Sequence, residues 1–322
     1  MSKETIQKIN EAIEKGASFL VTTHESPDGD AVGSSLALAS YLKELGKDVT
    51  VHFCDPVPEL YLFLPLVDTV VQTIPERHYD YCFVLDVGEF KRAGARLGAC
   101  RTIDSFINID HHLSCEDFGL YNLIDSTASA TGALIYRIIT AANHRISYDV
   151  ALCIYTAVIT DTGSFRYSNS NPEAFAIAGE MIAKGVNAWD VAEKLYESQP
   201  RKRLELLALV LATLVLSSKG DVASVTVTLD MYDKTGSGAE LTDGFINYPR
   251  SIRGVEVAIL FRELQPGSWK VGFRSKGKVN VARLASAFGG GGHHNAAGCS
   301  LDGELESVRA QVFAHLEFSL QE

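Results

Sequence analysis

The sequence predicts an α/β protein of two domains. An N-terminal parallel sheet with helices on both faces is followed by a smaller α/β domain with a mixed sheet. In the N-terminal half, short and nearly continuous apolar segments alternate with helix-like segments, the pattern of a parallel sheet buried on both faces. After Gly220 the pattern changes to alternating, strand-like segments. The 322 residues are sufficient for two separate cores.

The first domain is expected to span residues 1–195. Residues 1–16 carry charges at helical spacing and predict an amphipathic helix rather than a signal peptide. A further helix is expected at Ala31–Leu45, where Gly46 would end it. The predicted strands are Ser18–Thr23, Asp48–Phe53, Tyr81–Leu85 and Ser105–Ile109. Ligands bind outside the carboxyl ends of the strands in such sheets, so we expect functional residues there.

The rest of the chain is expected to be helical and then to form the second domain. Residues 130–216 look helical, with breaks at Asn143, Gly163–Asn171 and Gly185. Residues 196–219 are expected to be a helical linker and residues 220–322 the second domain, with the active site in the cleft between the two domains. The predicted elements of the second domain are strands at Val222–Leu229, Val255–Leu264 and Trp269–Ser275 and a helix at Val279–Phe288.

Histidine and aspartate side chains follow the apolar segments at four places. They are His24, Asp28 and Asp30, then Asp86, then Asp110, His111 and His112, and finally Asp161. Imidazole and carboxylate groups together are the ligands that hold two divalent transition-metal ions, an arrangement used to hydrolyse phosphate esters. Pro27 and Gly29 predict a tight turn that aims the first three side chains into one space.

Each of these residues has a simpler explanation when it is taken alone. Asp28 and Asp30 could be ordinary turn residues, and His24 could be a helix cap. Asp86 and Asp161 could cap the segments that follow them. The recurrence of such residues at the ends of four apolar segments is difficult to obtain by chance, and it favours a dinuclear metal site.

Composition and charge exclude several classes of protein. The hydrophobic content of 46% is that of a soluble protein, and the longest apolar stretch, Leu204–Leu216, is too short to span a bilayer. We therefore expect a cytoplasmic protein without a membrane partner. The six cysteines form no CxxC pair and are expected to be reduced. A net charge of −11 argues against binding of long nucleic acids but permits a short anionic substrate, because bound metal ions would reverse the local field.

Four motifs resemble those of the DHH phosphoesterase superfamily, which includes RecJ-like exonucleases and family II inorganic pyrophosphatases. They are TTHESPDGDAVGS, VLDVGE, NIDHH and ITDTGSFRYSN, and the later FGGGGHHNAAG is similar to the signature of the DHH-associated C-terminal domain. The resemblance covers nearly the whole chain and implies two divalent metal ions, with manganese as the usual metal. It implies one ion on His24, Asp28 and Asp86, and a second on Asp30, Asp86, His111 and Asp161.

The same resemblance implies catalytic roles for Asp86, Asp110 and His112. Asp86 would bridge the two ions, and Asp110 would orient His111, since metal-ligating histidines need a fixed tautomer. His112 would face the substrate and donate a hydrogen bond to its phosphate. None of the cysteines is needed for this chemistry.

The C-terminal residues expected to bind substrate lie in two segments. They are Arg274, Ser275, Gly290, Gly291, Gly292 and His293. Consecutive glycine amides can form an anion-binding nest, and arginine suits bidentate contact with phosphate. A mobile glycine loop and a solvated surface arginine are the alternatives.

Within the superfamily, the chain resembles the stand-alone nano-RNase/pAp-phosphatase group. This implies hydrolysis of short oligoribonucleotides to mononucleotides, of 3′-phosphoadenosine 5′-phosphate (pAp) to AMP, or of both, by a monomer or homodimer. The closest alternative is a stand-alone phosphodiesterase acting on cyclic di-AMP or on its linear product, the dinucleotide pApA. A metal-containing nucleotide-binding regulator without turnover is a third possibility, although such a protein would be expected to have lost a ligand.

Overall fold

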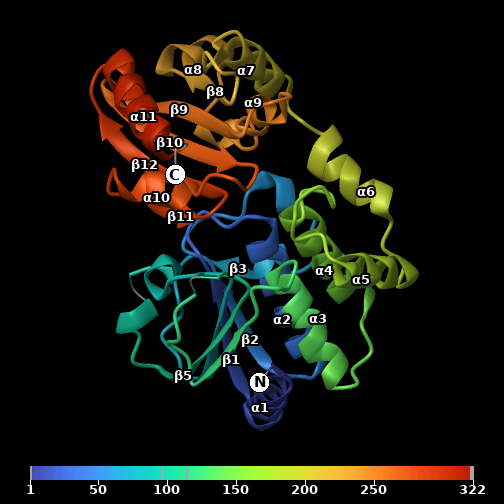
Figure 1. The fold of residues 1–322 in the computed structure, drawn as a ribbon. Helices are drawn as coiled ribbons and strands as arrows, with labels where there is room; N and C mark the ends of the chain where they lie inside the picture. The colour runs from blue at the N-terminus through green and yellow to red at the C-terminus, as the bar shows by residue number, and fades with distance from the viewer. Residues whose placement is uncertain (1, 96, 114, 320–322) are drawn as a thin grey trace. The chain divides into compact units, whose positions relative to one another are not determined.

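The structure is a computed structural model that describes residues 2–95, 97–113 and 115–319 (Figure 1). The chain forms two compact units, of which the first ends at Ser198 and the second begins at Gln199. All six cysteines are free thiols. Among the described residues, no helix combines the length and the apolar character needed to cross a bilayer.

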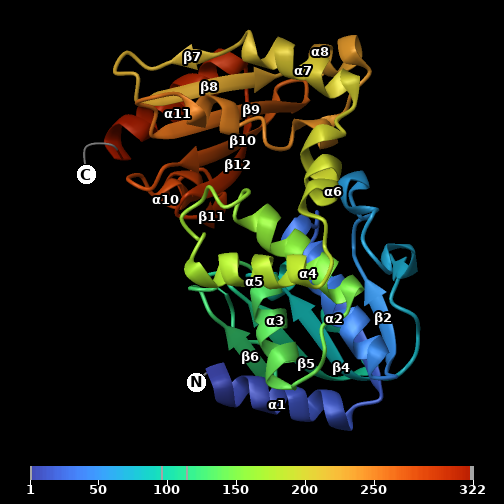
Figure 2. The same ribbon diagram turned by 90° about the vertical axis from the view of Figure 1, so that its right-hand side faces the viewer.

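The first unit is built on a six-stranded parallel sheet in the order β3-β2-β1-β4-β5-β6 (Figure 2). The strands are β1 (Ser18–Thr23), β2 (Asp48–His52), β3 (Val70–Val71), β4 (Tyr79–Leu85), β5 (Ile103–Asp110) and β6 (Tyr121–Ile124). The chain proceeds outward from β1 to β3 and then returns to the other side of β1 with β4. The carboxyl ends of β1 and β4 therefore flank the point at which strand order reverses, where open α/β sheets bind their ligands.

The α-helices of this unit share one core with one face of the sheet. They are α1 (Ser2–Lys15), α2 (Gly29–Glu44), α3 (Thr131–Ala141), α4 (Tyr148–Asp161), α5 (Pro172–Ala183) and α6 (Ala188–Ala192), which a π-helical turn (Glu193–Glu197) extends. Phe19 and Val21 of β1 belong to this core. Helix α2 lies close to α4, because a Cβ at Gly33 would come within 2.7 Å of the Cys153 carbonyl oxygen.

The opposite face of the sheet has a smaller core, to which the described residues contribute short helices. Leu20, Cys82 and Val84 pack there against Ala93 and Leu97, which lie in the short 3₁₀ helices η3 (Phe90–Ala93) and η4 (Leu97–Ala99). On this side, the part of the chain that the structure describes provides the predicted helical cover as 3₁₀ turns rather than α-helices. Glycines at 88, 94 and 98 interrupt the segment between β4 and β5 and disfavour a longer helix there.

The second unit contains a mixed six-stranded sheet in the order β11-β12-β10-β9-β8-β7. Strands β8 and β9 are parallel, and the other neighbours are antiparallel. The strands are β7 (Val215–Leu216), β8 (Val222–Val227), β9 (Val257–Gln265), β10 (Ser268–Ser275), β11 (Gly291–His293) and β12 (Ala296–Asp302). The helices are α7 (Arg201–Leu211), α8 (Leu229–Thr235), α9 (Asn247–Ser251), α10 (Val281–Ser286) and α11 (Leu305–Ser319), with the 3₁₀ turn η6 (Ala239–Thr242).

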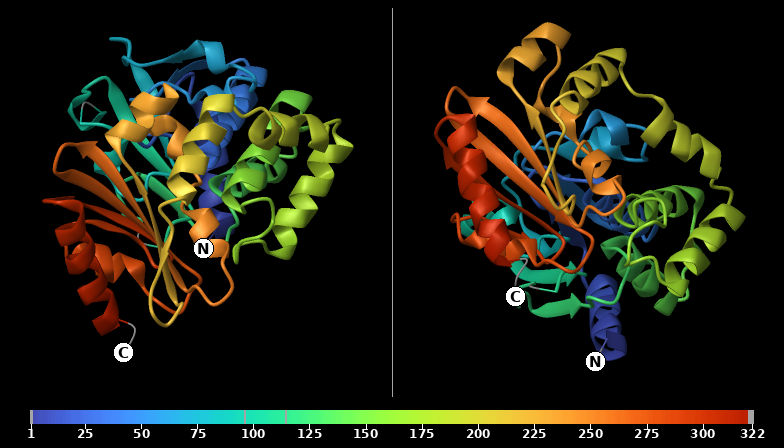
Figure 3. Two further views of the ribbon diagram at one scale, coloured as in Figure 1. Left: turned by 90° about the horizontal axis from the view of Figure 1, so that it is seen from above. Right: turned by 45° about the horizontal axis from the view of Figure 1, so that its top comes forward.

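Helices cover the two faces of this second sheet unequally. Helices α10 and α11 pack on the face that carries Val271 and Phe273 (Figure 3, α11 in red). On the other face, α7 buries Leu206 and Val210 against Val225 of β8. Helix α7 lies within residues 196–219, where a linker is expected, but its apolar side belongs to the core of the second unit. The expected boundaries at 195 and 220 stay predictions, while the chain divides between Ser198 and Gln199.

Candidate metal centre and phosphate-binding segments

The first group of predicted ligands comes from the turn between β1 and α2. Asp28 caps α2, since its Oδ1 accepts hydrogen bonds of 3.1 Å from the backbone N–H groups of Asp30 and Ala31. Asp30 itself lies in the first turn of the helix, which begins two residues earlier than expected. His24 Nδ1 lies 2.7 Å from the Glu25 carbonyl oxygen, and its Nε2 lies 3.9 Å from Asp28 Oδ1.

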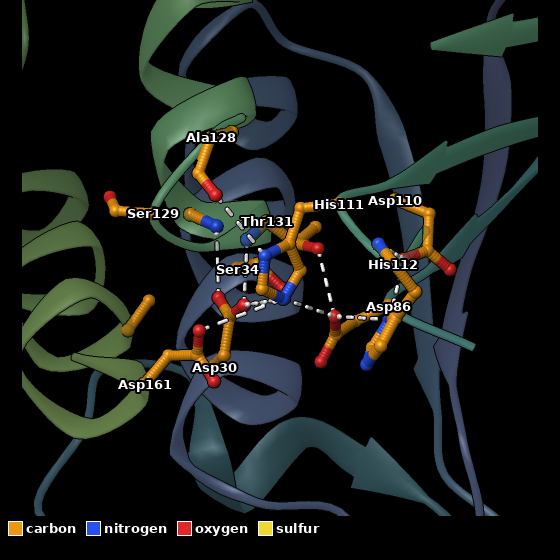
Figure 4. A network of polar contacts seen from close by, with 12 residues as sticks. Asp30, Ser34, Asp86, Asp110, His111, His112, Ala128, Ser129, Thr131 and Asp161 are labelled. Atoms are coloured by element: carbon orange, nitrogen blue, oxygen red, sulfur yellow. Dashed lines mark hydrogen bonds and ion pairs between the residues drawn. The ribbon is translucent and has the colours of Figure 1, made fainter. Parts of the chain in front are cut away.

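Asp86 lies at the centre of the site, directly after β4. Its Oδ2 is 3.8 Å from His24 Nε2. Its Oδ1 is 3.6 Å from His111 Nε2 (Figure 4). The residue is buried, and its φ of +61° places it in the left-handed region. Such a conformation in a non-glycine residue costs about 1–3 kcal/mol and is concentrated at functional sites. Oδ2 thus faces His24, while Oδ1 faces His111 and also lies 3.5 Å from His112 Nδ1.

His111 faces three carboxylates at once. Its Nε2 lies 3.7 Å from Asp30 Oδ2, 3.6 Å from Asp86 Oδ1 and 3.6 Å from Asp161 Oδ2. These separations are too long for hydrogen bonds. Two ligand atoms that each lie about 2.1 Å from a shared ion are about 3.4–3.8 Å apart at angles of roughly 110–130°. The observed spacing therefore suits a shared cation better than direct contact.

The predicted metal ligands fall into two groups that fit two ions. Within each group, ligand atoms lie within 4.8 Å of one another. The first group is His24, Asp28 and Asp86, and the second is Asp30, His111 and Asp161. Asp86 also lies within 4.8 Å of His111 and His112, which links the groups. The mixture of imidazole and carboxylate donors favours a transition metal over magnesium.

Burial raises the pKa of three carboxylates in this centre, so that they ionise less readily when no cation is bound. It raises the pKa of Asp30 to about 7 and that of Asp161 to about 6, against the opposing charge of His111. Burial and the neighbouring carboxylates raise the pKa of Asp86 well above its usual range. Burial also lowers the pKa of His24, which favours the neutral imidazole that binds metals. A bound cation would therefore stabilise the ionised form of these carboxylates.

Asp110 contacts His112 and not His111, which corrects our expectation. Its Oδ1 accepts a hydrogen bond from the backbone N–H of His112 at 2.8 Å and lies 2.6 Å from Nδ1 of that ring. Its Oδ2 accepts a hydrogen bond of 2.6 Å from Gly88 N–H. Burial opposes ionisation of Asp110, but His112 outweighs it and holds the Asp110 pKa well below its usual range. His111 Nδ1 instead lies 3.3 Å from the Ala128 carbonyl oxygen. Adjacent residues at a strand end point in different directions, so sequence order alone could not assign the partner.

Three residues that the sequence reasoning missed hold the ligands in place. Thr131 begins α3; its N–H donates to Asp30 Oδ2 at 2.6 Å, and its hydroxyl donates to Asp86 Oδ1 at 2.9 Å (Figure 4). Gly132 N–H donates to the other oxygen of Asp30 at 2.9 Å. Asn169 Nδ2 donates to Asp161 Oδ2 at 2.9 Å. Asn169 closes the fourth motif and could have been noticed there, whereas Thr131 follows no strand and has no such signal.

The predicted substrate-binding residues of the second unit lie around two neighbouring strands. Arg274 ends β10 opposite Ala296 of β12, and its Nη1 donates to the Phe273 carbonyl at 3.2 Å. Ser275 is buried and donates to Asn295 Oδ1 at 3.0 Å. The structure thus brings Arg274 and Ser275 next to the start of β12.

The glycine run forms a strand rather than a loop. Gly291, Gly292 and the backbone of His293 make β11, which pairs with β12. Gly290 N–H donates to the Ala285 carbonyl at 2.9 Å, which ties the run to α10. A Cβ at Gly292 would lie 2.5 Å from Ala296 O, so only glycine fits this close approach. The side chain of His293 lies outside the part of the structure that is described.

Comparison with known proteins assigns the family. Residues 18–158 match the DHH family, N-terminal domain, and residues 224–317 match the DHHA1 domain. A bifunctional oligoribonuclease and PAP phosphatase NrnA from Thermus thermophilus is 32% identical over 303 residues, which is 91% of this chain and 89% of that protein. The chain therefore belongs to the DHH family, and the resemblance seen in its motifs is confirmed.

Two further relatives agree over nearly the full length. A bifunctional oligoribonuclease and PAP phosphatase NrnA from Bacillus subtilis is 28% identical over 312 residues, 93% of each chain. The crystal structure of an exopolyphosphatase-related protein from Bacteroides fragilis superposes with a TM-score of 0.91 at 31% identity and covers 98% of this chain and 96% of that one. The predicted α/β fold, with one parallel and one mixed sheet, is confirmed.

Proposed function

We propose that this protein is a metal-dependent phosphoesterase that hydrolyses short oligoribonucleotides to mononucleotides and pAp to AMP. The names of both NrnA relatives state these two activities, and the relatives align with 91% and 93% of this chain. The observation that carries the proposal is the position of Asp86, whose two oxygens face His24 and His111. A buried carboxylate between two ligand groups is the feature that a dinuclear hydrolase requires.

The proposed cofactors are two divalent metal ions, with Mn²⁺ as the expected metal. His24, Asp28 and Asp86 would hold one ion, and Asp30, Asp86, His111 and Asp161 would hold the other. Divalent cations in such sites supply Lewis acidity and make water acidic enough to act as a nucleophile near neutral pH. The protein would contribute ligands that the fold already holds together, of which Asp28 is exposed, so that little reorganisation is needed when charge develops.

His112 is proposed to contact the substrate phosphate. Ionised Asp110 would accept a hydrogen bond from His112 Nδ1–H, which fixes the orientation of the ring and places its other nitrogen on the opposite edge. From there Nε2–H would donate a hydrogen bond to a phosphate oxygen and stabilise the negative charge that develops in the transition state. Asp110 would act through His112 as a positioning residue.

The second unit is proposed to bind the rest of the nucleotide through Arg274, Ser275 and the β11 glycines. Arginine can contact a phosphate with two parallel hydrogen bonds. Gly292 has no side chain where it closely approaches β12, and this would allow a substrate to approach the backbone at this edge of the sheet. The chemistry and the recognition of substrate would thus be divided between the two units.

A direct test is to assay the purified protein with Mn²⁺ against pAp, pApA, cyclic di-AMP, a five-nucleotide RNA and a 24-nucleotide RNA. We expect mononucleotides from the short RNAs, AMP from pAp and little product from the 24-mer. Asp86→Asn serves as the inactive control, because asparagine tolerates the left-handed backbone of this position. Efficient cleavage of cyclic di-AMP or pApA with no action on pAp would replace the proposal by a cyclic-dinucleotide phosphodiesterase.

A further inference from the structure

One face of the second sheet carries basic side chains over strands β9 and β10. Residues alternate between the two faces of a strand, so Lys270, Gly272 and Arg274 of β10 share the face opposite to the α10 and α11 core. Gly272 lies between the two basic residues and is paired with Gly298 of β12, and Ile246 Cδ1 would lie 3.8 Å from a Cβ at this position. Lys270 is exposed, and Arg274 is half-buried.

Lys270 lies directly opposite Arg262 of the neighbouring strand β9. Cross-strand partners point to the same face, and like charges in this position destabilise a sheet. Within the described part of the chain neither residue forms a salt bridge; Arg262 Nη1 donates only to the Ala239 carbonyl and the Thr242 hydroxyl, each at 3.3 Å. An anion bound between the two side chains would relieve this repulsion.

The charge of the protein is distributed unevenly between its two units. The first unit carries 27 Asp and Glu against 15 Lys and Arg, a net charge of −12. The second carries 13 Asp and Glu against 14 Lys and Arg, a net charge of +1. The acidity of the chain is therefore confined to the unit with the metal centre, and the second unit does not repel a polyanion.

We propose that Arg262 and Lys270 form a second phosphate subsite for oligonucleotides, in addition to Arg274. This inference rests on the proposed function and deepens it. Lys270 and Arg274 are four residues apart on one strand, which places them roughly 13 Å apart along the sheet. That is the spacing of their Cα atoms, and it suits two separate phosphates of one extended strand. The two phosphates of pAp lie on a single ribose, so the additional subsite would favour RNA over pAp.

The test uses the full-length double variant Arg262→Gln/Lys270→Gln. A matched control, Lys202→Gln/Lys219→Gln, removes the same charge from exposed positions of the same unit. We expect the first variant to lower kcat/KM for a five-nucleotide RNA about tenfold more than it lowers kcat/KM for pAp, a decrease typical of removing charged hydrogen bonds. The control should leave the ratio of the two substrates unchanged. The rate with pAp also reports whether each variant is folded.

A binding measurement separates this inference from the proposed function. Fluorescence anisotropy of a labelled five-nucleotide RNA, with the full chain in EDTA, needs no turnover. In the double variant the logarithmic salt slope should become shallower by about 0.7 for each phosphate that the protein no longer neutralises. If wild-type protein cleaves neither substrate, the proposed function fails, while the anisotropy still decides the subsite. An unchanged substrate ratio together with an unchanged salt slope would overturn the subsite.

Discussion

Thr131→Val should weaken metal binding while leaving the metal-free fold nearly intact. The Thr131 hydroxyl donates to Asp86 Oδ1 at 2.9 Å, and the backbone N–H of the same residue donates to Asp30. Valine has nearly the same shape as threonine and keeps the N–H contact. The substitution therefore removes a single hydrogen bond from the carboxylate that lies between the two ligand groups.

The size of the effect depends on the charge of Asp86. In the metal-free protein the raised pKa of Asp86 favours its neutral form, and a hydrogen bond between neutral groups contributes about 0.5–1.5 kcal/mol. With cations bound, Asp86 is ionised, and a hydrogen bond to a charged group contributes about 1.5–3 kcal/mol. The difference of about 1–1.5 kcal/mol corresponds to a decrease in metal affinity of roughly tenfold, at the lower end of the range for residues that support metal ligands.

Titration of the EDTA-treated protein with Mn²⁺ by calorimetry measures this affinity, and denaturant unfolding measures the stability of the metal-free fold. Thr131→Ser should behave like the wild type because it keeps the hydroxyl. Thr156→Val is a matched control: this buried threonine of α4 donates to the Leu152 carbonyl at 2.9 Å. The reasoning is refuted if Thr131→Val binds Mn²⁺ as tightly as the wild type, or if Thr131→Ser loses as much affinity.

Three further predictions concern the metal centre and the division between the units. Asp86→Asn should lose both ions by elemental analysis, whereas His112→Ala should retain them and lose about 10² or more in kcat; a metal-free His112→Ala protein would contradict these roles. In EDTA, the raised pKa of Asp30 predicts stability that is fully present below about pH 4 and is lost as pH rises through about 7, so denaturant unfolding at pH 5–8 should show a decline that Asp30→Asn reduces. A fragment ending at Ser198 should bind Mn²⁺ but hydrolyse nucleotides poorly, and Arg274→Ala should raise KM more than it lowers kcat; the opposite kinetic pattern would place Arg274 in the chemistry.

The elements that could be predicted are those whose apolar pattern is continuous. Strands β1, β4 and β5 lie within about two residues of their expected positions, because buried parallel strands read as apolar runs. Strand β6 has four residues and no alternation, so it gave no signal. Strands β11 and β12 were missed because glycine and alanine are not typical of strands. Here close packing between strands, and not residue preference, determines the structure.

In the site, residue types could be predicted better than their contacts. The predicted metal ligands are brought together because strand ends of a parallel sheet meet at one edge. The partner of Asp110 could not be derived, because it depends on which way two adjacent rings turn after the strand. The role of Thr131 could not be predicted for a different reason. Its backbone N–H and its hydroxyl both donate hydrogen bonds to ligands, but a threonine at the start of a helix is common and signals neither contact. Supporting contacts of this kind leave no pattern along a sequence.

The metal-free centre lowers the stability of the folded state, so other contacts in the first unit have to stabilise it. Its ligands lie between His24 and Asp161 in the sequence, so they meet only after the sheet, α2 and α4 have formed. Bringing buried carboxylates together raises their pKa values, which means that the metal-free centre favours unfolding at neutral pH. The close packing of α2 on α4 at Gly33 supplies a compensating contact that needs no metal. Substitution of Gly33 by a larger residue would therefore displace the ligands of both helices, even though Gly33 is not itself a ligand.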